Sequence, residues 1–152
     1  MKFTGDIWLN APRAAVFAKL RDARFFASCL EGVQDLNEID GDRYTAVLDT
    51  KVAYLKFKFN VMVAVARVDP PREIEAKIEG TPLGIVGRLT ARSLTRLTED
   101  DGATKVSYEV DAALTGKLGS LGQPVLRAKA KEMERQFTER MRAAFAESKS
   151  ET

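Results

Sequence analysis

The chain contains no histidine and only one cysteine, Cys29, among its 152 residues. Histidine is the side chain that titrates near neutral pH and the commonest metal ligand, so the usual acid–base catalyst is missing. Zinc sites built from Cys and His are excluded within one copy of the chain, as is an internal disulfide. Because no histidine can activate it, we expect Cys29 to be a buried structural thiol rather than a nucleophile.

Long apolar runs and a strong charge of one sign are also missing. The longest apolar run, residues 61–66, is far shorter than the roughly 20 residues that cross a bilayer. The amino terminus lacks the apolar run of a signal peptide. The 24 Lys and Arg nearly balance the 22 Asp and Glu, whereas nucleic-acid-binding proteins usually carry a basic stripe. We therefore expect a soluble, cytoplasmic protein that binds no nucleic acid and contacts a membrane at most peripherally.

Apolar and polar residues alternate over much of the chain, which predicts strands with one buried face. The longest such run, residues 55–65, places aromatic and β-branched side chains at every second position. Turn signals rich in Gly, Pro and Asp separate the runs. Seven antiparallel strands are expected, at residues 3–9, 33–39, 43–51, 52–68, 73–79, 85–98 and 105–114.

Helical patterns occur in two places. Two short helices are expected after the first strand, the first capped by Asn10 and the second, residues 22–30, ended by Gly32. A long helix begins between Ser120 and Pro124 and runs to Phe145, with apolar residues at i, i+4 spacing. This order predicts an α+β fold in which a curved sheet wraps around the last helix. We expect a single domain over residues 1–147 and a polar tail at 148–152.

The charged residues on the strands are expected to face solvent. Arg88, Arg92 and Arg96 share one face, and the acidic residues of the preceding strand lie opposite them, so cross-strand ion pairs explain the stripe better than anion binding does. Glu109 and Asp111 lie on the outer face by alternation, away from any shared site. Acid–base catalysis needs paired carboxylates facing one site, and we therefore predict a non-enzymatic protein.

Four local motifs stand at the boundaries of the expected elements. The strongest is the junction before the last helix, and the others lie in the first helix, the following loop and the last hairpin. They read Gly116-Lys117-Leu118-Gly119-Ser120-Leu121-Gly122, Ala11-Pro12 with Val16-Phe17 and Leu20-Arg21-Asp22, Cys29-Leu30-Glu31-Gly32-Val33, and Gly102-Ala103-Thr104. From Phe3 to Phe145 the chain resembles the CoxG-type family of carbon monoxide dehydrogenase proteins, within the START/polyketide-cyclase (SRPBCC) helix-grip superfamily.

The resemblance implies an apolar cavity between sheet and last helix, suited to a lipid- or quinone-like molecule. It also implies an accessory or recruiting role for a molybdenum hydroxylase of the carbon monoxide dehydrogenase type. We expect no cofactor or metal in the protein itself. Two departures matter. Glu31 stands where the family usually has proline, and this sequence stops at Thr152, where many members continue into an extension that could reach a membrane. Membrane anchoring is therefore not carried over.

Three interpretations stay open at this point. The inward rows form either a cavity or a solid core; the pattern alone favours the core, and a helix-grip fold favours the cavity. A cyclase- or hydrolase-like enzyme would need a polar cluster inside, where the rows offer tyrosines with Ser93 and Thr95. The third is an interaction module without ligand.

A cavity would be entered between residues 29–32 and 80–84. Tyr44, Tyr54 and Tyr108 would be its polar handles, unless their hydroxyls reach solvent at the sheet rim. The expected lining is Phe26, Cys29, Leu30, Tyr44, Leu48, Phe57, Phe59, Val61, Ile74, Ile78, Leu89, Tyr108, Val110, Val125, Met133 and Phe137.

Overall fold

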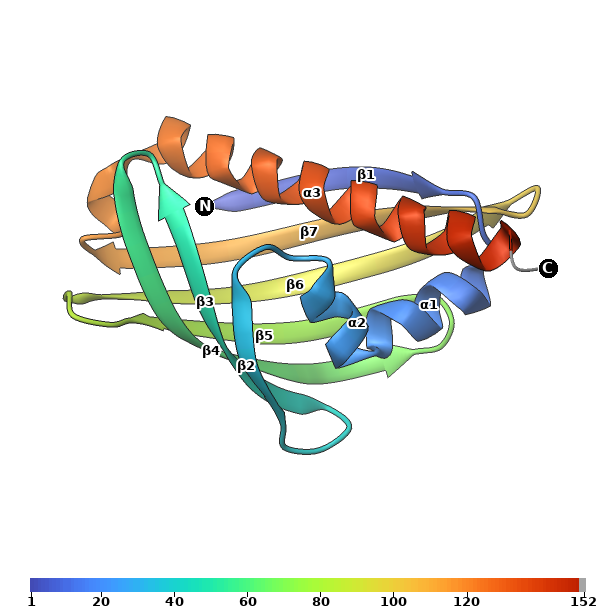
Figure 1. The fold of residues 1–152 in the computed structure, drawn as a ribbon, viewed down its shortest axis with the longest axis horizontal. Helices are drawn as coiled ribbons and strands as arrows, with labels where there is room; N and C mark the ends of the chain where they lie inside the picture. The colour runs from blue at the N-terminus through green and yellow to red at the C-terminus, as the bar shows by residue number, and fades with distance from the viewer. Residues whose placement is uncertain (151–152) are drawn as a thin grey trace.

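The computed structural model describes the backbone of residues 1–150 and the side chains of residues 1–146. A curved antiparallel sheet forms one layer, and three helices lie on its concave side (Figure 1). The seven strands stand in the order β1-β7-β6-β5-β4-β3-β2. Their bounds are β1 Lys2–Leu9, β2 Val33–Glu38, β3 Arg43–Val52, β4 Leu55–Asp69, β5 Glu73–Pro82, β6 Gly87–Asp100 and β7 Ala103–Gly116. The helices are α1 Arg13–Arg21, α2 Ala23–Ser28 and α3 Gln123–Ser150, with a 3-10 turn at Gly119–Leu121.

The sheet is a meander from β2 to β7, and β1 joins its far edge beside β7. Register shifts between Gln34 and Asn37 and between Val65 and Arg67 interrupt the ladders, and such bulges bend and twist a sheet. The resulting trough holds α3, whose backbone lies closest to β1 and β3. The predicted α+β helix-grip fold, with seven strands, two short early helices and one long last helix, is confirmed.

Two expected strand boundaries were wrong at the β5–β6 connection. β5 continues through Pro82, and β6 begins only at Gly87, so the turn covers residues 83–86 instead of 80–84. Pro82 is the last residue of its strand, where a missing N–H is tolerated. The next residue, Leu83, donates its N–H to the Lys58 carbonyl at 2.8 Å.

The expected ends of the helices also need correction. Pro12, not Asn10, is the N-cap of α1, and the carboxylate of Glu99 accepts the Arg13 N–H at 2.6 Å. The α1 cap therefore comes from the β6–β7 hairpin, far away in sequence. α3 extends past the predicted end at Phe145 to Ser150, so it includes part of the expected polar tail, whose last residues, 151 and 152, lie outside the described ones.

The end of α2 differs in a way that matters for the site. α2 stops at Ser28 with Cys29 as its C-cap, and Gly32 lies three residues further on with φ +86°. A Cβ at Gly32 would collide with the Asp49 carbonyl oxygen. Gly32 therefore allows the loop after α2 to lie directly on β3, rather than ending the helix.

Two hydrophobic clusters hold the molecule together, one at each end of the trough. The α1 cluster consists of Ile7, Leu9, Ala11, Val16, Cys29, Leu97, Val106, Met141 and Phe145. The hairpin cluster consists of Val52, Phe57, Phe59 and Leu118, with Leu121 and Val125 packed against it. α3 thus contributes its start to one cluster and its last described turns to the other.

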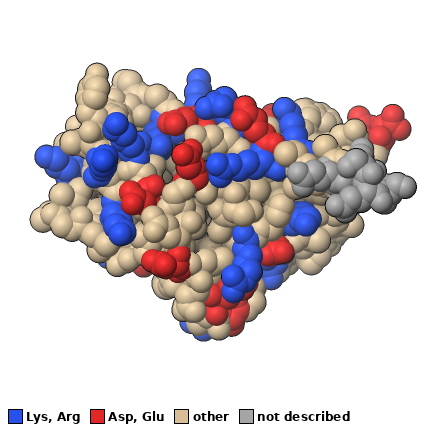
Figure 2. Space-filling model, viewed as in Figure 1, with Lys and Arg blue, Asp and Glu red and all other residues tan. Residues whose placement is uncertain are grey.

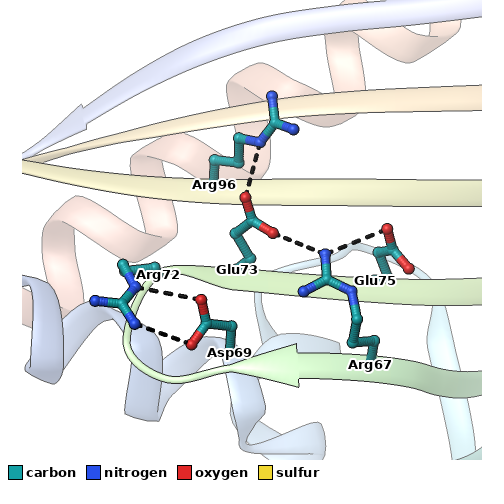
Figure 3. Close-up of polar contacts among 6 residues, drawn as sticks. All are labelled: Arg67, Asp69, Arg72, Glu73, Glu75 and Arg96. Carbon is teal, nitrogen blue, oxygen red and sulfur yellow. Dashed lines mark hydrogen bonds and ion pairs between the residues drawn. The ribbon is translucent and has the colours of Figure 1, made fainter.

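Ion pairs cover the convex face of the sheet, as the sequence predicted. Glu73 accepts from Arg67 at 2.7 Å and from Arg96 at 3.1 Å (Figure 3), and Arg88 lies 3.4 Å from Glu79. Hydrogen bonds from Arg67 and then Arg96 lower the pKa of Glu73. Arg92 differs, since its neighbours across the ladders are Lys77 and Asp111.

Thr104 connects the first loop to the last strand. It is fully buried, at 0% exposure, and its Oγ1 donates to the Ala11 carbonyl at 2.7 Å.

We predict that Thr104→Val lowers the free energy of unfolding by about 1–3 kcal/mol, because the buried carbonyl loses its partner. Urea denaturation measures the change. The matched control Thr98→Val, on the exposed face of β6, should stay within about 0.5 kcal/mol; equal effects of the two changes would refute the assignment.

Candidate ligand-binding site

The middle of the trough is not filled by α3. Val63, Ile74 and Ile78 point inward by alternation, yet they are only partly buried. Seven strands spaced by about 4.8 Å span roughly 29 Å, whereas a helix with its side chains is about 10 Å across. Because the backbone of α3 lies closest to β1 and β3, the inner face of β4 to β6 faces α1 and α2 instead.

The main hollow is a cleft of about 780 Å³ bounded by α3, the loop after α2 and the β3–β4 hairpin. Its volume lies within the range of about 300–1,000 Å³ that small-molecule sites occupy. Apolar lining comes from both sides, and charged residues stand at the rim. The residues are Leu30, Glu31, Asp49, Thr50, Lys51, Ala53, Lys56, Val125, Ala128, Lys129, Glu132, Met133 and Gln136.

A second hollow of about 140 Å³ lies beneath α1 and α2, on the inner face of β3 to β6. Four of the expected lining residues border this hollow: Phe26, Tyr44, Ile74 and Ile78. Ser93 and Thr95 also line it, which confirms their inward orientation. Its polar side chains are Arg21, Glu38 and Asp40 with the hydroxyls of Tyr44, Ser93 and Thr95.

A side-chain hydrogen bond ties the mouth of the main cleft to α3. The Gln136 amide donates from Nε2 to Glu31 Oε2 at 3.0 Å. One turn further along α3, Arg140 donates to the Ser28 carbonyl at 3.3 Å. Both contacts hold the loop after α2 against the helix. Glu31 therefore has a defined task at the position where the resembling family usually carries proline.

Charges of both signs surround the opening. Lys129 forms an ion pair with Glu132 at 3.5 Å on α3, and Lys51, Lys56 and Asp49 come from the β3–β4 hairpin. Below this rim, Leu30, Val125 and Met133 supply apolar surface. The cleft is therefore amphipathic, with a charged entrance and an apolar floor.

The expected lining residues divide into groups according to where the structure places them. Leu30, Val125 and Met133 line the main cleft, and Phe26, Tyr44, Ile74 and Ile78 line the second hollow. Leu48, Phe57, Phe59, Val61 and Leu89 belong to the hairpin cluster or pack against it. Cys29 is buried in the α1 cluster, and Tyr108 and Phe137 pack against that cluster. Val110 is partly buried on the inner face, between Phe3 and Ser93.

Cys29 and the predicted entrance need separate comment. The thiol is only 2% exposed, and burial raises its pKa, which agrees with a structural role. Residues 80–84 of the expected entrance line neither hollow, and Gly80 and Pro82 are buried in β5. The β3–β4 hairpin borders the main cleft. The tight turn of the β3–β4 hairpin is visible in the sequence, but the position of this hairpin against α3 is not. The hairpin residues that line the cleft were therefore not predicted.

The three tyrosines have different surroundings. Tyr54 is 95% exposed at the tip of the β3–β4 hairpin, so its hydroxyl reaches solvent. Burial raises the pKa of Tyr44 in the second hollow. Tyr108 lies with Glu134 over Gly5, where a side chain would clash with both. Burial first, and then the Glu134 carboxylate, raise the pKa of Tyr108.

Residues 5–146 match the family described as the G subunit of carbon monoxide dehydrogenase (CoxG). The chain belongs to this family. No curated protein matches it. Among solved structures, a conserved protein from Geobacillus kaustophilus is 27% identical with a TM-score of 0.89, covering 97% of each chain. Protein Ms6760 from Mycobacterium smegmatis, at 16% identity, has a TM-score of 0.70 and covers 97% of this chain and 92% of its own. Ara h 8.0201, at 14% identity, has a TM-score of 0.67 and covers 95% and 96%.

Family and fold together indicate a ligand-binding accessory protein, and the family is associated with carbon monoxide dehydrogenase. The neighbours below 25% identity show the SRPBCC helix-grip fold alone. Within the described residues, no group of three His, Cys, Asp or Glu side chains is placed to hold a metal ion. None of the helices in that part of the chain has the length and apolarity to cross a membrane.

The Tyr108 environment predicts a dependence of stability on alkaline pH. A raised pKa means that the folded state holds the phenolic proton more tightly than the unfolded chain does. The protein should therefore lose stability as the pH rises above about 10, the usual tyrosine value. Urea midpoints at increasing pH measure the loss. Tyr108→Phe should reduce its slope, whereas Tyr54→Phe should leave it unchanged; a slope unaffected by Tyr108→Phe would contradict the assignment.

Proposed function

We propose that the protein binds an apolar small molecule with a polar head group, of a lipid- or quinone-like kind, in the main cleft. The observation that carries the proposal is the cleft of about 780 Å³ between α3, the loop after α2 and the β3–β4 hairpin, with Leu30, Val125 and Met133 among its lining residues. A concave site of this volume with apolar and polar lining is the kind of site that small molecules occupy.

The lining supports an amphipathic ligand. An apolar chain or ring would lie against Leu30, Val125 and Met133. A carbonyl or acidic head group would stay near Lys51 and Lys129, where water and ammonium groups remain accessible. Burying apolar surface at roughly 25 cal/mol per Å² would supply most of the affinity. The second hollow would receive the far end of a longer molecule.

We further infer that the protein serves a molybdenum hydroxylase of the carbon monoxide dehydrogenase type without catalysing a reaction itself. Family membership supports the partner. The absence of histidine from the sequence supports the lack of catalysis, and the exposed Glu109 and Asp111 lie on the convex side. The task would be to hold the ligand, and to present it or recruit the enzyme, inside the cytoplasm.

Delipidated protein tests the proposal directly. Short-chain ubiquinone or a fatty acid at about 100 times its Kd should stabilise the fold by about 2.7 kcal/mol, because only the folded state binds it. Thermal unfolding measures the shift. Lack of any shift across quinones and fatty acids would overturn the proposal.

A matched pair of variants locates the bound molecule. Ala128 lines the cleft, so Ala128→Trp should obstruct it and weaken binding at least tenfold. Ala143 is an exposed alanine on the same helix outside the cleft, so Ala143→Trp should keep the wild-type affinity. Equal affinities of the two variants would place the ligand elsewhere.

A further inference from the structure

The two hollows are lined by neighbouring turns of the same two segments. Leu30, in the loop after α2, and Met133 of α3 line the main cleft. Phe26 stands four residues before Leu30 and lines the second hollow. On α3, Phe137 follows Met133 by about one turn. The boundary between the two hollows therefore lies where Phe26 and Phe137 stand.

The two phenylalanine rings meet across this boundary. The centroids of the Phe26 and Phe137 rings are 5.2 Å apart, and the ring planes are inclined by 54°, which is an aromatic contact of the tilted kind. Phe137 also packs against the α1 cluster, so its ring is supported from behind. The contact closes the gap between α2 and α3 with apolar side chains.

Polar contacts hold the end of α2 and the following loop against α3. Gln136 donates to Glu31 at 3.0 Å on the cleft side. One turn later, Arg140 donates to the Ser28 carbonyl at 3.3 Å. The C-cap of α2, Cys29, is 2% exposed within the α1 cluster. The two rings therefore stand on elements that are fixed relative to each other.

We propose that the Phe26–Phe137 pair is a partition that sets the length of the apolar chain accepted by the main cleft. Because this role presupposes a ligand in the cleft, it rests on the proposed function. The stretch of α3 that lines the cleft, from Val125 to Gln136, is about 16 Å long at 1.5 Å per residue. The fitting ligand is a single-chain amphiphile whose apolar part lies along this stretch and ends at the two rings.

A longer chain has two places for its remaining methylene groups. They can stay in the opening, where Figure 2 shows basic and acidic side chains mixed over α3, so an apolar chain gains little there. They can instead separate the rings and enter the second hollow. Separation costs the ring contact, a factor of roughly two to ten in the binding constant, and it also unpacks Phe137 from the α1 cluster. Methylenes beyond the length of the cleft therefore add no affinity in the native protein.

A homologous series of ligands tests the partition in the native, delipidated protein. The probes are saturated fatty acids from octanoate to octadecanoate, each below its critical micelle concentration, and competition with a fluorescent fatty acid measures their affinities. Each buried methylene adds roughly fourfold in affinity. The affinity should therefore rise with chain length until the chain end reaches the rings, and then level off.

Truncation of either ring should move this plateau to longer chains. Beyond the rings, the second hollow offers Ile74 and Ile78 as apolar surface. In Phe26→Val and in Phe137→Val, octadecanoate should bind at least tenfold more tightly than it binds to the native protein. The matched control is Phe25→Val, because the Phe25 ring packs against the α1 cluster and borders neither hollow. Its plateau should match the native one.

A second change in the hollow separates a longer path from a general loosening of the fold. Ala76 lines the second hollow, so Ala76→Leu occupies part of that space. Added to Phe26→Val, it should restore the native plateau. Phe26→Leu removes less apolar volume and repeats the test if thermal unfolding shows Phe26→Val to be unstable. A plateau that stays long in the double variant would place the chain end outside the second hollow and refute the partition.

The results distinguish failure of the partition from failure of the proposed function. If the native protein binds neither the fatty acids nor ubiquinones of increasing isoprenoid length, both fail. If it binds only the ubiquinones, their length series takes the place of the fatty acids in every comparison. If affinity rises through the longest chain, or if the plateau is unchanged in the Phe26 and Phe137 variants, ligand binding stands and the partition alone is wrong.

Discussion

The structure depends on a mismatch of widths between one helix and a seven-stranded sheet. α3 is 28 residues long, about 42 Å at 1.5 Å per residue, so it reaches along the whole trough. It is only about a third as wide as the sheet, and its backbone lies closest to β1 and β3. At the two ends of the trough, the loops and α1 add apolar side chains, and these fill the space between α3 and the sheet as the two clusters. Between them Phe26 of α2 packs against Phe137 of α3, with ring centroids 5.2 Å apart, and the cleft opens beside α3 at the β3–β4 hairpin.

Much of the fold could be predicted from local pattern. The alternation in β4 placed Phe57 and Phe59 inward, and both are buried; the spacing on α3 placed Met141 and Phe145 inward, and both are buried as well. Leu55 belongs to the same alternation but is 41% exposed, because its position in the β3–β4 hairpin lies beyond the end of the covered trough. Local pattern describes which face a residue takes, but not where the cover over that face ends.

The site was harder to predict because it is made of contacts between distant segments. The Glu31–Gln136 hydrogen bond joins residues 105 positions apart, and the Glu99 cap of α1 comes from 86 positions away. Met133 and Leu30 could be named from their apolar character. The charged rim residues could not, because a lysine on a hairpin is normally read as a solvated surface group. Only the curvature of the sheet brings that hairpin against α3.

The charged rim also explains why the cleft does not collapse. Closing α3 onto the β3–β4 hairpin would bring Lys51, Lys56, Asp49, Lys129 and Glu132 together out of water. Removing an ion from water costs several kcal/mol unless a well-placed partner replaces the lost hydration. Within the described residues, only Lys129 and Glu132 form an ion pair among these five. Desolvation at the rim therefore opposes the apolar attraction of Leu30, Val125 and Met133, and the cleft stays open.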